Sequence, residues 1–598
     1  MPVSISNLRS NPKTSTYENG PVPQARRPHR SYSLVLFTMR LLEAVLLAYS
    51  TSLSSVLAAT HEIWWDITYL NANPDGLHER RVIGINGTWP PPIELSSNDT
   101  LVVHAHNSLD VPTSLHHHGM FFPNRTYFDG AVGVSQCGIP PGESFTYEVP
   151  VFESAQWGTY WIHAHASGQY VDGLRGPVVV HHKDAAGESL EAHRSSYDDE
   201  MTVVLADWYH DEHSVNNAKF LSRWNPGGAE PVPESSLIYF TANGTNIPGF
   251  NENTTLNFVP GKTYRLRVIN TSALAMFYFW IDGHEMRIIE VDGVSDSKPQ
   301  DDSALMSMQT DVVEAPTPLL TLTVAQHITS SITYSADAPM APEQTMDDYD
   351  SMPWDTTFKP LEPMTLPNPT KELELGVFFD TMDNGINRGM FNSMLPRCVK
   401  ASSNNTPDVT WNVPIVPSTI SALTMGEDAS VANVYGPNAE VLQYGEIVQM
   451  TVVNWDDGKH PLSDDVTSDD PAVNPPFDNN QVNPIWRDTV QIEGGGSVTI
   501  RWQAWVFLEA PNVMQQWTKP PQYYFDQCKM LGVPISGNAA GHNSTTDLSG
   551  LTIGPFPQKL GWNAKGIGAM TGCVLSALLG IATVIWYSTG PGKDAGDD

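Results

Sequence analysis

The chain has 598 residues and a formal net charge of −34, with 32 Lys and Arg against 66 Asp and Glu. This length exceeds what one hydrophobic core usually organises, which excludes a single small binding module and predicts several domains. The acidic balance repels polyanions, so nucleic acid is not an expected partner. With 40% hydrophobic residues the chain is globular, and its 47 Pro and 44 Gly favour many short strands over long helices. The sequence therefore predicts a mostly β fold.

Residues 39–59 form a candidate export signal. They place a positive charge before an apolar run that closes on small residues, as in a secretory signal peptide cleaved near Ala58 or Ala59. Because residues 1–38 precede this run, we expect Met39 to be the true initiator. The alternative to a signal peptide is that residues 39–59 form a buried helix. Eight Asn-x-Ser/Thr sequons favour a secreted, glycosylated chain. These sequons are Asn86, Asn98, Asn124, Asn243, Asn253, Asn270, Asn404 and Asn543.

Three blocks of alternating apolar and polar residues between turn signals predict three β-sandwich domains. An acidic, Pro-rich stretch between the second and third blocks reads as a solvated linker. The expected boundaries are 1–59 for the N-terminal extension and signal peptide, 60–185 for domain 1, 186–340 for domain 2, 341–370 for the linker and 371–560 for domain 3.

Two short strings in the first domain carry metal-binding chemistry. Residues 115–119 read Leu-His-His-His-Gly, and residues 158–165 read Gly-Thr-Tyr-Trp-Ile-His-Ala-His. Residues i and i+2 of a strand face the same side, so each His-x-His would project two imidazoles with Cα atoms about 6.6 Å apart. A lone histidine is usually structural, but two such pairs on neighbouring strands favour a polynuclear centre of copper, iron or zinc. The candidate ligands are His116, His118, His163 and His165.

The four cysteines, Cys137, Cys398, Cys528 and Cys573, are too few for a disulfide-dense scaffold. Cys573 falls in the apolar segment described next. An oxidising compartment favours a bridge between two of the other three, and the sequence alone leaves open which two.

Residues 566–587 contain no charged side chain. At about 1.5 Å per helical residue they would cross a hydrocarbon core of about 30 Å, which predicts a membrane anchor. With an export signal in front, the bulk of the chain would lie outside the cell and residues 588–598 would form a short inner tail. The expected location is the cell surface, as a single-pass plasma-membrane protein.

The histidine strings, with Asp129-Gly130 and Gln136-Cys137 between them, resemble the first cupredoxin domain of the multicopper oxidases. Further matches are Trp208-Tyr-His-Asp211, the stretch 454–461, Arg487-Asp-Thr-Val and the tail Lys565-Gly-Ile-Gly. Together with the anchor they resemble the fungal cell-surface ferroxidases that partner an iron permease, over about residues 60–590. The resemblance implies an all-β fold of three cupredoxin-like Greek-key sandwiches plus one C-terminal transmembrane helix.

The resemblance also implies a copper-dependent oxidase that couples one-electron oxidation of ferrous iron to four-electron reduction of O2 to water, in iron uptake. In the family a type 1 blue copper takes electrons from the substrate, and a cluster of type 2 and paired type 3 coppers reduces dioxygen. By position, the implied ligands are His116 for type 2 copper, His118, His163 and His165 for type 3, and His460 for type 1.

Other family positions match three carboxylates and two cysteines. Asp129 corresponds to the acid that assists proton delivery to oxygen. Two further carboxylates, Asp207 and Asp456, correspond to family residues that bind ferrous iron, and at the first position the family usually carries Glu. Carboxylate oxygens are hard ligands that suit iron. The alternative is that both are ordinary solvated surface carboxylates. The disulfide of the family maps onto Cys137 and Cys528.

The third domain departs from the family pattern at two places. The family continues His-Pro-x-His-x-His-Gly, whereas residues 460–465 read His-Pro-Leu-Ser-Asp-Asp. Its His-Cys-His-x-x-x-His motif is also missing, because residues 499–511 contain neither Cys nor His and His542 is the only histidine after His460. Either exons were mis-joined when the gene was translated, or the chain is a copper-poor relative.

Two other functions stay open on the sequence. One is a laccase-type oxidation of phenols or pigment precursors by the same copper sites. The other is a non-catalytic, cupredoxin-like surface protein that serves a membrane partner through the anchor, since the type 1 cysteine and half of the cluster ligands are missing.

Overall fold

The computed structural model of the chain describes residues 59–184, 187–190, 197–275, 519–551 and 564–589 and, with gaps, 277–333, 367–454 and 484–503. Contacts between Cα atoms divide the chain into Met1–Leu57 and Ala58–Asp598. The first unit lies outside the described residues, so the predicted export signal stays a prediction.

The first part of the chain folds into two four-stranded sheets around one hydrophobic core. Their strand orders are β2-β1-β4-β6 and β3-β8-β7-β5. In β4, Leu101, Val103 and Ala105 are buried and the residues between them are partly exposed, so alternation in the sequence turns one face of the strand into the core. The strands are β1 Thr60–Ala72, β2 Arg80–Ile85, β3 Ile93–Ser96, β4 Thr100–Asn107, β5 His116–His118, β6 Ser144–Val149, β7 Gly158–His163 and β8 Arg175–His181.

The second part of the chain contains a four-stranded sheet of order β11-β10-β9-β13, with a core of its own that includes Val203, Leu205 and Phe240. Three two-stranded pairs accompany it, β12-β18, β14-β17 and β15-β16. The elements are β9 Asp199–Trp208, α3 His213–Phe220, β10 Ser235–Ala242, β11 Thr245–Asn246, β12 Thr255–Asn257, β13 Tyr264–Asn270, β14 Phe277–Phe279, β15 Glu290–Val291, β16 Val294–Ser295, β17 Met306–Met308 and β18 Ser331–Thr333.

Buried arginines join these first two parts. The Arg175 side chain is 1% exposed, and its Nη1 donates a hydrogen bond to the carbonyl oxygen of Thr271 at 2.9 Å. The guanidinium of Arg80 lies 4.2 Å from the centroid of the Trp208 ring and pairs with Asp172 at 3.0 Å. A buried guanidinium is costly unless it is paired, so these contacts fix how the two sandwiches meet.

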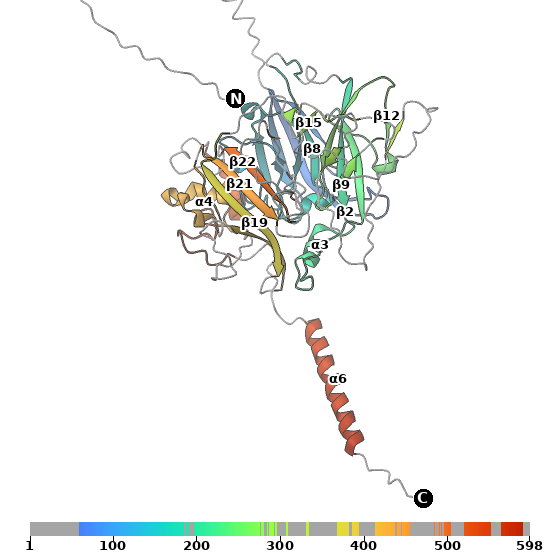
Figure 1. Ribbon diagram of the computed structural model, residues 1–598, viewed down its shortest axis with the longest axis vertical. Helices are drawn as coiled ribbons and strands as arrows, with labels where there is room; N and C mark the ends of the chain where they lie inside the picture. The colour runs from blue at the N-terminus through green and yellow to red at the C-terminus, as the bar shows by residue number, and fades with distance from the viewer. Residues whose placement is uncertain are drawn as a thin grey trace, which may run out of the picture. The chain divides into compact units, whose positions relative to one another are not determined.

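The third part of the chain contains a four-stranded sheet of order β20-β19-β21-β22, and Figure 1 shows β19, β21 and β22 side by side. Its strands are β19 Lys371–Thr381, β20 Asn387–Ser393, β21 Ile447–Asn454 and β22 Ser497–Gln503. The central pair, β19 and β21, is parallel, and the outer pairs are antiparallel. The prediction of a mostly β chain is confirmed.

Two short helices from the C-terminal half pack against the first sandwich. They are α4 Ser418–Thr424 and α5 Gln522–Met530. Ile420 and Tyr524 belong to the core of the first sandwich, and the Tyr524 hydroxyl donates to the carbonyl oxygen of Ser135 at 2.7 Å. Cys137 and Cys528 form a disulfide between residues 391 positions apart. The first and last parts of the protein therefore share one core.

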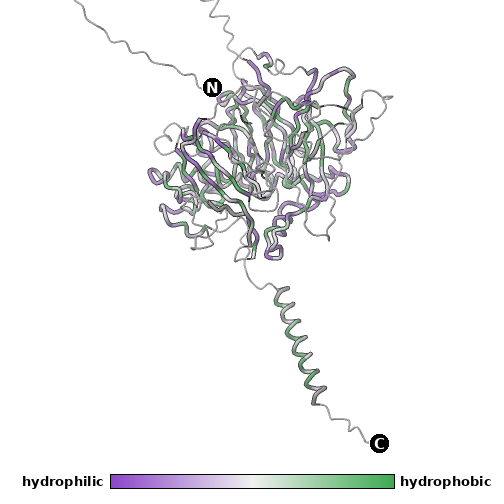
Figure 2. Tube along the Cα trace, viewed as in Figure 1, coloured by the Kyte–Doolittle hydropathy of each residue, from purple (hydrophilic) through white to green (hydrophobic). Residues whose placement is uncertain are grey.

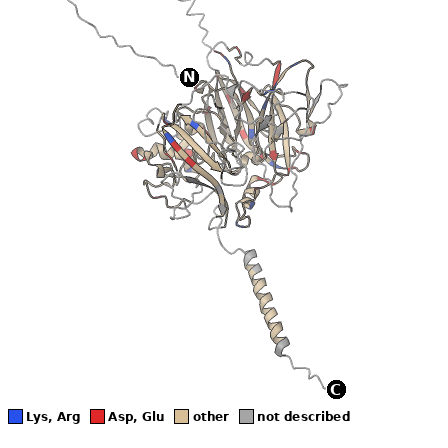
Figure 3. Cartoon of the chain, in the orientation of Figure 1, with Lys and Arg blue, Asp and Glu red and all other residues tan. Residues whose placement is uncertain are grey.

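Helix α6, Ala564–Thr589, covers the segment for which an anchor was predicted. The part of α6 coloured in Figure 2 is mostly hydrophobic, and in Figure 3 that part carries no charge. Within the described residues, none of the helices meets the length and apolarity required to cross a membrane. The transmembrane prediction is therefore not confirmed.

Candidate metal centre

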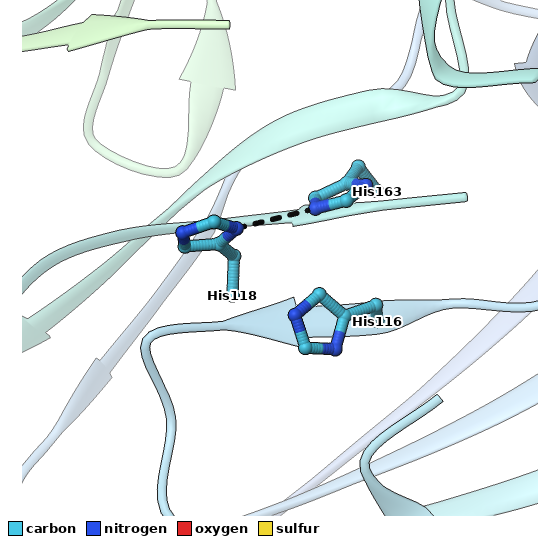
Figure 4. A group of neighbouring side chains, drawn as sticks. All are labelled: His116, His118 and His163. Carbon is cyan, nitrogen blue, oxygen red and sulfur yellow. Dashed lines mark hydrogen bonds between the residues drawn. The ribbon is translucent and has the colours of Figure 1, made fainter. Parts of the chain in front are cut away.

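Three histidines meet where β5 and β7 pair. The antiparallel register places His116 opposite His163 and His118 opposite Trp161. One ligand nitrogen of each of His116, His118 and His163 lies within 4.8 Å of those of the other two, and Figure 4 shows the three imidazoles facing a common space. His118 Nδ1 and His163 Nε2 are 3.4 Å apart. The structure thus brings together three of the four predicted cluster ligands within metal-binding reach.

His165 joins this group by a different route from the one predicted. Strand β7 ends at His163, so His165 does not continue the strand and its side chain is exposed. The backbone N–H of Ala164 still donates to Leu174 O at 3.0 Å, in register with the β7–β8 pairs, so the irregular backbone begins after Ala164. The His165 ring centroid nevertheless lies 5.2 Å from that of His116. All four rings are therefore neighbours, although the second His-x-His does not lie on one strand.

Asp129 sets the orientation and charge of His116. His116 Nδ1 lies 2.9 Å from the backbone oxygen of Asp129 and 3.3 Å from its carboxylate Oδ1. Burial acts to lower the pKa of His116, but the hydrogen bond and the charge of Asp129 outweigh it, so the pKa is raised. A proton held at Nδ1 leaves Nε2 as the ligand atom. The structure places Asp129 beside the cluster, and its predicted part in proton delivery stays a prediction.

His163 is held in the neutral form that a metal ligand requires. Burial, with the charge of His116 as the next cause, holds the pKa of His163 well below its usual range. Its Nδ1 lies 3.0 Å from Ala164 O, which assigns the proton to Nδ1 and the lone pair to Nε2. The ring is stacked on Trp161 with centroids 4.0 Å apart, and Trp161 also stacks on His118 at 5.1 Å. Trp161 thus braces two ligands, a role that its i, i+2 spacing from His163 could have indicated.

Family models described as multicopper oxidase match three segments of the chain, residues 66–185, 199–306 and 395–507. The chain is 40% identical to the iron multicopper oxidase fer1 of Mycosarcoma maydis, over 91% of this chain and 96% of that protein. It is 32% identical to the iron transport multicopper oxidase fetC of Epichloe festucae, over 90% and 91%.

The chain belongs to the multicopper oxidase family.

The fold agrees with this assignment. The crystal structure of Fet3p, a multicopper oxidase that functions in iron import, superposes with a TM-score of 0.68 at 26% identity, over 83% of this chain and 99% of that one. The multicopper oxidase described here thus has a cupredoxin-like fold. Its alignment with the Mycosarcoma maydis protein runs over 633 positions, more than the 598 residues of the chain. That relative therefore contains segments with no counterpart in this chain.

A multicopper oxidase implies type 1, type 2 and type 3 copper sites. The clustered imidazoles fit copper of the trinuclear type, because imidazole nitrogens suit copper and three of them converge. Bound copper would store electrons there and pass them to O2, while Asp129 and Trp161 orient the ligands. The type 1 site does not fit the chain as it stands. Cys137 and Cys528 are bonded to each other, and neither Cys398 nor Cys573 has a neighbouring histidine in the sequence.

The structure does not support Asp207 as an iron ligand open to solvent. Its side chain is 0% exposed, and Oδ2 accepts hydrogen bonds from the backbone N–H groups of Ala273 and Leu274 at 2.9 and 2.8 Å. Burial raises the pKa of Asp207, although Arg175 and these N–H donors oppose the rise. An aspartate side chain is one methylene shorter than the Glu usual in the family, and here its carboxylate is held by this inner loop.

Two predicted site residues cannot be placed. Asp456 and His460 both lie outside the described residues, so their roles in iron and type 1 copper binding stay predictions.

Cys137 and Cys528 are joined to each other, the pairing that the family resemblance implied and that the sequence alone left open.

His117, between two ligands, occupies a site suited to an aromatic ring. It is 1% exposed, packs against the rings of Phe122 and Tyr147, and neither ring nitrogen has a hydrogen-bond partner among the described residues. Burial, then the charge of His116, lowers its pKa to about 3. We expect His117→Phe to raise the free energy of unfolding at pH 7 by about 1–2 kcal/mol, because an unsatisfied buried polar group is removed.

The effect should depend on pH with a defined sign. The folded-state pKa of His117 is depressed, so its unfolded form binds a proton first and wild-type stability falls as the pH drops below about 6.5. The Phe variant lacks this loss. Its advantage in urea unfolding should therefore grow by about 1.4 kcal/mol per pH unit between pH 6 and 4. A constant advantage across that range would contradict the buried, neutral state of His117.

Proposed function

We propose that this chain is a copper-dependent oxidase that couples one-electron oxidation of ferrous iron to four-electron reduction of O2 to water, in iron uptake. The observation that carries the proposal is the histidine cluster between β5 and β7, in a chain 40% identical over 91% of its length to a protein named an iron multicopper oxidase. Ferrous iron is the substrate of the proposed reaction, and copper is the resident metal.

The two missing ligand motifs favour a second candidate function. A chain that lacks both His-Cys-His and the His-x-His that the family carries after His460-Pro461 cannot supply a blue copper thiolate or complete a trinuclear cluster from its own sequence. The 598-residue chain would then be a copper-poor surface protein that binds metal in its first domain without catalytic turnover. Sequencing the transcript across codons 455–515 separates the two candidates, because a mis-joined gene would yield both motifs.

The activity is tested on the protein encoded by that transcript, with ferrous iron and a phenol as competing substrates. We expect kcat/KM to be at least about tenfold higher for iron, which corresponds to about 1.4 kcal/mol of transition-state discrimination. His163→Ala should abolish turnover and lower bound copper, and His78→Ala, which replaces an exposed histidine that is not a member of the histidine cluster, should change neither. A preference for the phenol would replace the iron assignment with the laccase-type one. Full activity of His163→Ala would remove the cluster from the mechanism.

We also propose a cell-surface location with α6 as the membrane anchor, next to an iron permease. Support comes from the charge-free segment 566–587, the signal-like residues 39–59 and the exposed apolar side chains of α6, such as Leu579 at 69% and Val584 at 67%. We expect the full chain to sediment with membranes and to resist carbonate extraction, and a chain ending at residue 563 to be released into the medium. Equal release of both chains would contradict an anchor.

A further inference from the structure

A pocket of about 260 Å³ opens on the outer face of the β2-β1-β4-β6 sheet, away from the histidine cluster. Trp64 of β1 and His104 and His106 of β4 line it together with Asn86. The Trp64 side chain is 63% exposed, which is unusual for an indole on a folded sheet. The proposed oxidase chemistry uses none of these residues.

Trp64 is held as a flat platform. One face of its ring stacks on His104 with centroids 4.9 Å apart and planes 18° from parallel. His104 is fixed in turn, because its Nδ1 lies 3.0 Å from the Thr146 hydroxyl on β6. The indole is therefore ordered while much of its surface stays open to solvent.

Asn86 sits at the edge of this platform in a tight turn directly after β2. Asn86 and Gly87 have φ angles of +52° and +74°, and Asn86 is exposed. Its Nδ2 donates to Trp64 O at 3.2 Å, and its Oδ1 accepts from Asp66 N at 2.8 Å. These bonds tie the amide to β1 beside the indole, and the second hydrogen of Nδ2 is left for substitution. The tripeptide Asn86-Gly87-Thr88 is a glycosylation sequon.

We propose that Asn86 carries an N-linked glycan whose first sugar packs on the exposed face of Trp64. The co-substrate is a lipid diphosphate-linked oligosaccharide of the secretory pathway. The bond from sugar C1 to the diphosphate oxygen breaks, a bond from C1 to Nδ2 forms, and the displaced Nδ2 proton leaves with the lipid diphosphate, with no change of oxidation state. The retained Nδ2 hydrogen keeps the bond to Trp64 O. The C–H face of the sugar then covers apolar indole surface that is otherwise in contact with water.

The chain contains a matched control for this site. Asn243-Gly244-Thr245 is the same tripeptide in the same kind of turn, with φ angles of +52° and +68°. The Thr245 hydroxyl donates to Ala242 O at 3.0 Å, as the Thr88 hydroxyl donates to Ile85 O at 3.0 Å. The threonine of either sequon can therefore be replaced at the same local cost.

The experiment uses the full chain made in the secretory pathway of a yeast host and purified from its membranes in detergent, with glycopeptide mass spectrometry at both asparagines. Thr88→Val and Thr245→Val remove one sequon each, in wild type and in Trp64→Ala. We expect a sugar on Asn86, and loss of the Asn86 sequon should lower Tm by about 2–4 °C more in wild type than in Trp64→Ala. Thr245→Val should lower Tm equally in both backgrounds. The extra loss should vanish when the chain is made in a bacterial host that attaches no glycan.

Two results would overturn the proposal. An unmodified Asn86 in the chain made by the yeast host rules out the site, whatever the state of Asn243. A modified Asn86 whose removal costs the same with and without the Trp64 ring rules out the packing. Neither result bears on iron oxidation, so this test and the test of the proposed function fail independently.

Discussion

The 598-residue chain, loaded with copper, is expected to lack the intense blue absorption of a type 1 site and to leave O2 unreduced. That absorption arises from a Cu–thiolate bond with two histidines and a cysteine. Cys137 and Cys528 form a disulfide and therefore offer no thiolate to copper. Neither Cys398 nor Cys573 is flanked by histidine in the sequence. Copper bound at the first-domain histidines has imidazole ligands only, so weak absorption and loosely held metal should be seen.

The measurement is a visible spectrum with copper quantified per chain, beside oxygen consumption in the presence of ferrous iron. A chain in which His-x-His and His-Cys-His are restored at residues 461–515 serves as the control and should turn blue and consume O2. A strong blue band with stoichiometric copper in the 598-residue chain would contradict this prediction, because a cysteine thiolate would then have to bind the copper.

Gly130→Ala is expected to dismantle the copper cluster from outside its ligand set. Gly130 has a φ of +94°, and a Cβ atom there would stand 1.9 Å from Leu115 O and 2.7 Å from His116 Cα. Both contacts are with the backbone that leads into β5, so the strand must shift. We expect a loss of about 3–5 kcal/mol in the free energy of unfolding. Most cluster-bound copper should be lost with it, since His116 and His118 lie on β5.

Gly142→Ala is the matched control. Gly142 also has a positive φ, +78°, but a Cβ there would meet no atom within 4 Å. It should therefore cost only the backbone strain, about 1 kcal/mol, and retain copper. Urea unfolding and copper content are measured on both variants. Similar losses in the two would show that the turn conformation, and not the close approach to β5, is what matters at Gly130.

Much of the metal centre could be predicted because it depends on local geometry. The i, i+2 spacing of His116 and His118 places both on one face of a strand, whatever the rest of the fold does. Pairing with the strand that ends at His163 needs only that two nearby segments share a sheet. The same local rule turns Leu101, Val103 and Ala105 of β4 into the core. The absence of a histidine-flanked cysteine is likewise a property of the sequence.

The tertiary structure decided what depends on distant segments. Strand β7 ends at His163, and one further bond to the chain before β8, from Ala164 N–H to Leu174 O, precedes the irregular backbone that carries His165. Asp207 is buried because N–H groups of the loop that contains Ala273 and Leu274 converge on it, which no spacing around Asp207 reveals. Helix α5 docks on the first sandwich through Tyr524 and Cys528 across 391 residues of chain. Such contacts require complementary surfaces that exist only after both partners have folded, so the sequence determined the ligands and the fold determined their surroundings.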